Sequence, residues 1–245
     1  MQKFELFFFF IAAVFFIAAV FGNTSMSALC NGVLLHHDPV PSCQGKRIIF
    51  LEGNVGVGKS SLLTQLAAAG CCAVVPEGVD NPAFRESLLR FQEQPATSFH
   101  LQVAANSDLL RRVVYALQAP ETTVVLERGP IGGQVFCNVG RERQTLDPLE
   151  GRLCEAMLQS ARDLLRFTRV STLMLSLDPA AALQRVEERN RRGEDNMALS
   201  YLVDVDRSYR SLLSSVPGVV YIDASRSPEV VMNEVVAVVV ESRLS

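Results

Sequence analysis

The run Gly53–Ser60 constrains the fold of this chain more than any other segment, because it fits the phosphate-loop pattern GxxxxGK[ST]. Residues 47–51 before it are typical of a buried strand, and residues 61–67 after it are typical of the first turns of a helix. In such a loop, backbone N–H groups and the helix N-terminus point at phosphate oxygens. We therefore expect a nucleotide site at this junction. The residues predicted to hold phosphate are Gly53, Asn54, Val55, Gly56, Val57, Gly58, Lys59, Ser60 and Ser61.

Two residues of this loop have distinct expected roles. The Lys59 ammonium would reach the outer phosphates, and the Ser60 hydroxyl would ligate Mg²⁺. The alternative is a glycine-rich strand–helix turn that binds nothing. That alternative does not explain why the only lysine beyond position 46 falls at position 59.

Short apolar runs alternate with helical patterns after the loop, which predicts an α/β fold. The runs are rich in Val, Ile and Leu, as in parallel strands covered on both faces. We predict a P-loop NTPase-type three-layer fold, with a five-stranded parallel sheet, helices on both faces and an arginine-rich lid. The predicted strands are 47–52, 73–76, 122–126, 171–177 and 219–223, and the predicted helices are 59–68, 82–91, 99–117, 130–139, 148–167, 179–191, 200–213 and 227–242. Asp147, Asp178 and Ser227 are predicted N-caps.

Composition argues against binding to nucleic acid or to a membrane surface, and against disulfides or a metal site. The net charge of −3 and the pI of about 5.7 argue against a nucleic-acid coat or a polybasic membrane patch. The six cysteines, at positions 30, 43, 71, 72, 137 and 154, include an adjacent pair and no C-x-x-C spacing. We therefore expect reduced, buried cysteines rather than a disulfide framework. The three histidines are too scattered to predict a metal site.

The first residues differ in character from the rest of the chain. Residues 6–21 are an unbroken apolar run, which as a helix would span ~24 Å, short of the ~30 Å hydrocarbon core of a membrane. This run is typical of a signal peptide or a short membrane anchor. The alternative is a dispensable leader, with Met26 as the functional start. We divide the chain into a leader (1–25), a linker (26–46) and one nucleotide-binding domain (47–245).

Charged residues follow several of the predicted strands. Ligands of open parallel sheets bind outside the carboxyl ends of the strands. Glu77 follows the second strand, and Glu127 and Arg128 follow the third. The helix after the fourth strand leads into an arginine-rich segment at 185–192. Two carboxylates and an arginine are therefore expected at the edge that holds the phosphates.

These motifs together resemble the deoxynucleoside kinase family, which contains the thymidine, deoxycytidine and deoxyguanosine kinases. The resemblance covers residues 47 to about 240. The family's EGNIGSGKS run is similar to EGNVGVGKS at 52–60, and its Pro-Glu-Pro motif is similar to Pro-Glu-Gly at 76–78. The other matching residues are Phe99 and Gln102 for a Phe-x-x-Gln motif, Glu127, Arg128 and Gly129 for Glu-Arg-Ser, and Arg185, Arg189, Arg191 and Glu194 for the lid.

The resemblance implies an ATP-dependent kinase domain, cytoplasmic unless the leader targets or anchors it, that phosphorylates the 5′-hydroxyl of a deoxynucleoside. Glu77 would accept the hydroxyl proton, with Arg128 orienting it. Glu127 would support Mg²⁺ beside Ser60, and the lid arginines would stabilise the transferring phosphoryl group together with Lys59. Gln102 would pair with the edge of the base, and Phe99 would contact the base or the sugar. Members of this family are usually homodimers.

Several positions depart from the family pattern. Gly129 replaces a serine, and Phe91 replaces a tyrosine that bonds the sugar 3′-hydroxyl, although Glu194 could bind that hydroxyl. Leu109 and Gly133 replace an arginine and an aspartate of the cytidine- and purine-selecting members. An uncharged pocket with room for a 5-methyl group would favour thymidine.

Two other functions stay open at this point. A nucleoside monophosphate kinase would share the loop and the lid, but it would need a basic clamp near Glu77, for which Arg85 is the one nearby candidate. A membrane-tethered nucleotide-binding module without catalysis would account for the apolar leader and for Gly129.

Overall fold

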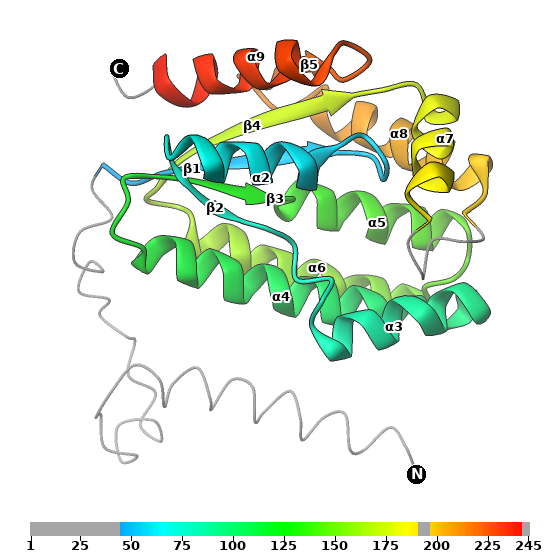
Figure 1. Ribbon diagram of the computed structural model, residues 1–245. Coiled ribbons are helices and arrows are strands. Elements are labelled where there is room, and N and C mark those ends of the chain that lie inside the picture. The colour runs from blue at the N-terminus through cyan, green and yellow to red at the C-terminus, as the bar shows by residue number, and fades with distance from the viewer. Residues whose placement is uncertain (1–44, 191–196, 242–245) are drawn as a thin grey trace, which may run out of the picture. The chain divides into compact units, whose positions relative to one another are not determined.

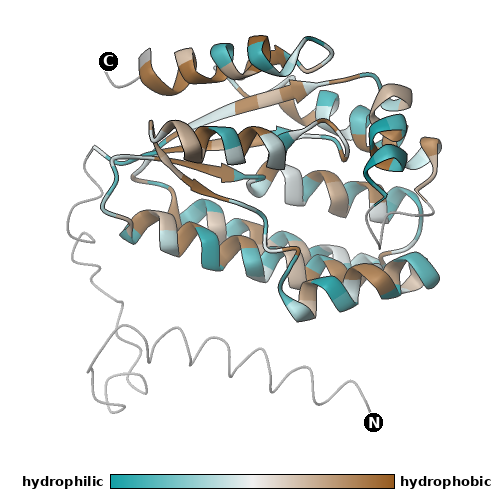
Figure 2. Cartoon of the chain, viewed as in Figure 1, coloured by the Kyte–Doolittle hydropathy of each residue, from teal (hydrophilic) through white to brown (hydrophobic). Residues whose placement is uncertain are grey.

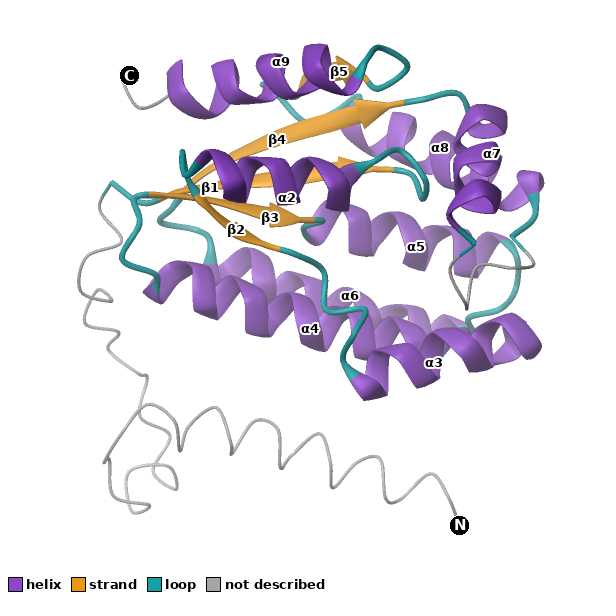
Figure 3. Ribbon diagram, viewed as in Figure 1, coloured by secondary structure: helices purple, strands orange, loops and turns teal. Residues whose placement is uncertain are grey.

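The computed structural model of the protein describes residues 45–190 and 197–241 (Figure 1). A five-stranded, fully parallel sheet lies at the centre, in the order β2-β3-β1-β4-β5 (Figure 3). This confirms the predicted fold class, and each predicted strand end lies within two residues of the observed one. The strands are β1 (Arg47–Gly53), β2 (Ala73–Val75), β3 (Thr123–Glu127), β4 (Arg169–Ser176) and β5 (Val220–Asp223).

Helices cover both faces of the sheet. The side chains of β1 alternate between the faces, as the geometry of a strand requires. Ile49 and Leu51 pack with α2 and α9 on one face, and Ile48 and Phe50 pack with α4 and α6 on the other (Figure 1). The helices are α2 (Lys59–Ala69), α3 (Pro82–Glu93), α4 (Ser98–Gln118), α5 (Pro130–Glu142), α6 (Pro148–Leu164), α7 (Pro179–Arg189), α8 (Leu199–Leu213) and α9 (Pro228–Glu241).

Local signals account for where several of these helices begin. Asp147 accepts from the backbone N–H groups of Leu149 and Glu150, forming a capping box with the Glu150 side chain. Asp178 caps α7, and the Ser227 hydroxyl accepts from the Val230 N–H at 3.4 Å. All three predicted N-caps are therefore confirmed. A proline at the first turn of α3, α5, α6 and α7 has no N–H to satisfy there.

Among the described residues, the buried apolar side chains form three clusters around the sheet. Figure 2 shows hydrophobic colouring along β2 and β3, and mixed colouring on the helices around the sheet. Cys137 and Cys154 are buried thiols, whereas Cys71 and Cys72 are only partly buried. Within residues 45–190 and 197–241, no helix is both long and apolar enough to cross a membrane. The leader, most of the linker, Arg191 and Glu194 lie outside the described residues.

Candidate active site

The phosphate loop joins β1 to α2, and glycines allow its conformation. Gly53, Gly56 and Gly58 have positive φ angles, of 145°, 82° and 101°. At Gly56 a Cβ atom would lie 2.4 Å from the Ala182 carbonyl oxygen, so α7 packs directly on the loop. The Asn54 side chain donates to the Leu202 carbonyl at 2.8 Å and so holds the loop to α8. The predicted phosphate loop therefore has both the backbone geometry and the supports that it needs.

Lys59 lies folded back on its own loop. Its Nζ donates to the carbonyl oxygens of Gly53 at 3.1 Å and Asn54 at 2.7 Å, and the residue is 5% exposed. Burial, followed by the positive charge of Arg128, lowers the pKa of Lys59 to about 7. The Lys59 side chain therefore lies within the predicted phosphate loop, in surroundings that do not favour its charge.

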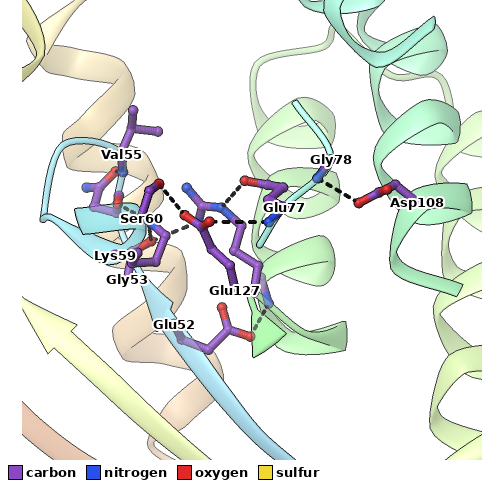
Figure 4. Close-up of polar contacts among 12 residues, drawn as sticks. Glu52, Gly53, Val55, Lys59, Ser60, Glu77, Gly78, Asp108 and Glu127 are labelled. Atoms are coloured by element: carbon purple, nitrogen blue, oxygen red, sulfur yellow. Dashed lines mark hydrogen bonds and ion pairs between the residues drawn. The ribbon is translucent and has the colours of Figure 1, made fainter. Parts of the chain in front are cut away.

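Ser60, Glu127 and Glu77 form a connected group beside the loop (Figure 4). The Ser60 hydroxyl donates to Glu127 Oε1 at 2.9 Å, and Glu127 Oε2 accepts from the Glu77 backbone N–H at 3.2 Å. A hydroxyl and a carboxylate in contact are the hard oxygen donors that Mg²⁺ prefers. The structure thus brings together the two residues that the sequence predicted as metal ligands.

Glu77 and Arg128 form an ion pair at the same edge, with 3.2 Å between Arg128 Nε and Glu77 Oε2. Arg128 Nη1 also donates to the Gly53 carbonyl at 2.8 Å and to the Tyr209 hydroxyl at 3.0 Å. Burial lowers the pKa of Arg128, but Tyr209 and the surrounding carboxylates outweigh burial and raise that pKa above its ordinary value. The guanidinium is therefore fixed between the phosphate loop and the Glu77 carboxylate.

Glu52 supports the Glu77–Arg128 pair through hydrogen bonds to residues next to Arg128. It is 0% exposed, and its carboxylate accepts from the Gly129 and Gly132 N–H groups at 2.8 and 3.1 Å and from the Tyr209 hydroxyl at 2.9 Å. Burial raises the pKa of Glu52, and these hydrogen bonds and Arg128 counter part of that rise. The sequence motif included Glu52, but nothing in the sequence pointed to Tyr209, which comes from α8.

The departure at Gly129 has a steric cause. A Cβ atom there would lie 2.5 Å from the aromatic ring of Phe50. A serine would therefore require Phe50 to move. The backbone N–H of Gly129 still donates to Glu52 as described above, so the absence of the serine leaves the Glu127–Arg128 segment anchored.

The residues expected to read the base lie on α4 and α5. Gln102 is buried, and Cys137 Sγ lies 3.8 Å from its Oε1. Asn106 is one helical turn further along α4 and is 1% exposed, and its Nδ2 has no hydrogen-bond partner in the described structure. Asn106 was not among the predicted site residues, because a helix asparagine carries no local signal of burial. Two buried amides, Gln102 and Asn106, therefore lie on one face of α4, where the sequence predicted only Gln102.

The space beside Gly133 is filled by neighbouring side chains. A Cβ atom at Gly133 would lie 2.4 Å from Leu158 Cδ2 and 3.0 Å from Asn106 Oδ1, so these side chains already fill the space. Leu109 belongs to the apolar cluster that includes Phe50. Leu158 from α6 therefore occupies the position next to Gly133 into which a larger side chain would project.

The other predicted contact residues lie on α3 and at the start of α4. The Phe99 ring is partly buried, and its centroid lies 6.4 Å from that of His100. The Phe91 ring lies 6.3 Å from that of Tyr201, between α3 and α8. Arg85 is exposed and lies 3.6 Å from Asp80, so it pairs at the surface.

The described part of the lid also reaches the phosphate loop. Arg185 on α7 donates to the carbonyl oxygens of Ala224 at 3.0 Å and Val57 at 3.5 Å. Arg189 lies in the last turn of α7. The predicted lid residues Arg191 and Glu194 follow, outside the described ranges.

A parallel sheet with this loop and a carboxylate–arginine pair at the same edge defines a P-loop kinase. Residues 49–242 match the family described as deoxynucleoside kinase, so the chain belongs to that family. The thymidine kinase of Ictalurid herpesvirus 1 (strain Auburn) is 30% identical over 203 residues, covering 78% of this chain and 85% of that protein. The deoxyguanosine kinase of Dictyostelium discoideum is 27% identical over 174 residues, covering 68% of this chain and 59% of that protein. Deoxyadenosine kinase from M. mycoides with bound dCTP shares the fold, with a TM-score of 0.63 and 15% identity over 77% of this chain and 96% of that chain.

Proposed function

We propose that this deoxynucleoside kinase transfers a phosphoryl group from ATP to the 5′-hydroxyl of its nucleoside, with thymidine the favoured substrate. The observation that carries this proposal is the ion pair of Glu77 with Arg128, at 3.2 Å, on the sheet edge that holds the phosphate loop. A sugar hydroxyl is a weak nucleophile, so a carboxylate within hydrogen-bond reach is needed to accept its proton. Glu77 is suited to that role, because its side chain is 18% exposed at the edge of the site rather than enclosed in the core.

Arg128 acts on both partners of the reaction. Its guanidinium holds one Glu77 oxygen through Nε, which leaves the other oxygen for the 5′-hydroxyl. Its Nη1 donates to the Gly53 carbonyl, so the same guanidinium fixes the Glu77 carboxylate relative to the phosphate loop. Proton acceptor and phosphate site are thereby held in one geometry, and such positioning accounts for much of the rate gain in phosphoryl transfer.

The phosphate side of the site uses the loop and the lid. The backbone N–H groups of the loop, Lys59 and Arg185 offer positive charge to the phosphates. Ser60 and Glu127 would hold Mg²⁺, which when bound neutralises phosphate charge. The Ser60 hydroxyl donates to Glu127 at 2.9 Å, so the two proposed ligands lie together.

Two buried amides and the absence of charge support thymidine. The Gln102 amide can both donate and accept, and thymine presents an N–H between two carbonyls. Asn106 adds a second buried amide, whose Nδ2 can donate to a carbonyl but not to an exocyclic amine that is itself a donor. Leu109 and Gly133 place no charge at the positions where the resemblance led us to look for one. A relative named thymidine kinase is consistent with this preference.

The test is a phosphorylation assay with ATP and each of the four deoxynucleosides, for the full chain and for the Glu77→Gln variant. We expect thymidine to have the highest kcat/KM. We expect Glu77→Gln to bind ATP and thymidine normally by calorimetry, while its turnover falls ~10²-fold or more. Glu86→Gln is the control, since Glu86 is an exposed carboxylate that pairs with Arg90 on α3.

The role of Glu77 and the preference for thymidine can be contradicted independently. Near-normal turnover of Glu77→Gln would remove this carboxylate from the role of base. A strong preference for deoxyguanosine or deoxyadenosine would contradict the choice of thymidine and leave the role of Glu77 intact.

A further inference from the structure

A second set of buried charges, Asp108 and Arg112 on α4, contacts the backbone next to Glu77 and Arg128. Asp108 on α4 has a side chain that is only 4% exposed. Its Oδ2 accepts from Arg112 Nε at 2.6 Å and from the Gly78 backbone N–H at 3.0 Å, and its Oδ1 accepts from Arg111 at 2.7 Å (Figure 4 shows the Gly78 contact). Burial raises the pKa of Asp108, but Arg112 and Arg111 outweigh burial and leave that pKa below its ordinary value. Asp108 is thus a buried carboxylate whose backbone partner is the residue directly after Glu77.

Arg112 carries this connection to the next strand. Its side chain is 3% exposed, and its Nη1 donates to the Glu127 carbonyl at 2.6 Å and to the Arg128 carbonyl at 3.3 Å. Arg128 has a φ angle of 56°, in the left-handed region that non-glycine residues seldom adopt. The hydrogen bonds that Arg112 donates to the carbonyls of Glu127 and Arg128 help to hold Arg128 in that conformation.

Gly78 is fitted to Asp108. A Cβ atom at position 78 would lie 2.2 Å from Asp108 Oδ1, so any other residue would push the carboxylate away. Proline at this position would also lack the N–H that Asp108 accepts. The contact between Gly78 and Asp108, which lie thirty positions apart, therefore requires a glycine at position 78.

The segment that carries Glu77 needs such a tether. β2 has three residues and lies at the edge of the sheet, and Glu77 comes two residues after its last residue, Val75. Its other backbone anchor is the bond from the Glu77 N–H to Glu127, a residue that would itself hold the metal. Asp108 offers a second anchor, from α4, that does not involve either of the proposed metal ligands.

We infer that Asp108 and Arg112 are positioning residues for phosphoryl transfer, which join the Glu77 segment to the Glu127–Arg128 segment and so set the geometry of the Glu77–Arg128 pair. This inference rests on the proposed role of Glu77. Neither side chain touches a reacting atom. They act through the backbone at Gly78 on one side and through the carbonyls of Glu127 and Arg128 on the other.

Steady-state kinetics of Asp108→Asn test the inference. A displacement of about 1 Å at a catalytic group can cost ~10²-fold, so we expect kcat to fall by 10- to 100-fold, with the KM values for nucleoside and ATP within about threefold. Arg111→Gln is the matched control, because Arg111 bonds the same carboxylate but is 66% exposed and reaches neither strand end. We expect its kcat to stay within about twofold of the unaltered protein.

The double variant Glu77→Gln/Asp108→Asn separates positioning from general damage. If Asp108 acts through Glu77, the double variant turns over as slowly as Glu77→Gln alone, because groups that act as a unit are not additive. Losses that multiply would overturn the inference, as would an equal loss in Arg111→Gln. Normal kcat in Asp108→Asn beside a slow Glu77→Gln removes the positioning role only. Normal kcat in Glu77→Gln removes the proposed base and this inference with it.

An amide signal provides a readout that does not depend on turnover. In NMR spectra of the full chain, the Gly78 N–H should exchange slowly and its resonance should shift in Asp108→Asn but not in Arg111→Gln. An unprotected Gly78 amide in the unaltered protein would contradict the inference. If Asp108→Asn is too unstable to purify, Gly78→Ala replaces it in the kinetic test, since the added Cβ displaces the carboxylate, and a normal kcat there would overturn the proposal.

Discussion

Nucleotide binding should be linked to proton uptake at Lys59. Lys59 is 5% exposed, its Nζ donates to the loop carbonyls of Gly53 and Asn54, and burial and then Arg128 lower its pKa from 10.5 to about 7. Phosphates in the loop would bring several negative charges to this ammonium, and opposite charges favour the protonated form. The pKa of Lys59 should therefore rise when nucleotide binds.

The sign and size of the linkage follow from these values. A group with a pKa of about 7 is mostly unprotonated at pH 8, so binding there should take up as much as about one proton, and the Kd should weaken by up to ~10-fold per pH unit above pH 7. Lys59 has a further effect on folding. The unfolded chain holds more protons on Lys59 than the folded, nucleotide-free protein does between pH 7 and 10.5, so its contribution to the free energy of unfolding rises with pH over that range.

Isothermal titration calorimetry with ATP provides the assay. Titrations at pH 6.5 to 9, in buffers with different ionisation enthalpies, give the number of protons taken up. Lys59→Arg is the informative variant, because a guanidinium stays charged over this range and should abolish the uptake. Lys46→Gln is the control, since Lys46 donates to the carbonyls of Ala119 and Glu121 and not to the loop. No proton uptake at pH 8 in the unaltered protein would refute the reasoning.

Two further predictions concern the supports of the site. Tyr209→Phe removes a hydroxyl that donates to Glu52 and accepts from Arg128, and should lower the free energy of unfolding by ~1–3 kcal/mol in urea titrations; an unchanged midpoint would contradict that role. Gly129→Ser places a Cβ 2.5 Å from the Phe50 ring and should cost ~1–3 kcal/mol of unfolding free energy by overpacking, part of which Phe50→Leu should restore; a serine variant as stable as the original would show that the ring moves freely.

The sequence was sufficient for the fold because its signals are local. Parallel strands buried on both faces are runs of Val, Ile and Leu, and all seven residues of β1 are buried. Helix starts coincide with Asp147, Asp178 and Ser227, whose side chains bond N–H groups two or three positions away. Ends were less predictable, since α6 stops at Leu164 rather than at residue 167.

The same distinction separates the site residues that were found from those that were missed. Ser60, Glu77, Glu127 and Arg128 lie in short motifs at strand ends, where topology alone brings them together. Asp108 was missed because an aspartate followed by arginines at the third and fourth positions is the usual pattern of a solvated helix face. The spacing was correct for two ion pairs, but one of the arginines, Arg112, turns inward to the carbonyl of Glu127 at the end of β3.

The choice of base illustrates why a residue type at one position does not predict a pocket. From the sequence, the loss of charge at Leu109 and Gly133 predicts an uncharged pocket with room for a 5-methyl group, and Gly133 has no side chain to fill the space beside it. In the folded chain that space contains Leu158 from α6, and Asn106 from α4 lies against it. Protein interiors are close-packed, so volume removed from one helix is usually taken by its neighbours. Selection between bases should accordingly depend on the amides of Gln102 and Asn106 and on how α6 packs behind them, rather than on the residues at 109 and 133 alone.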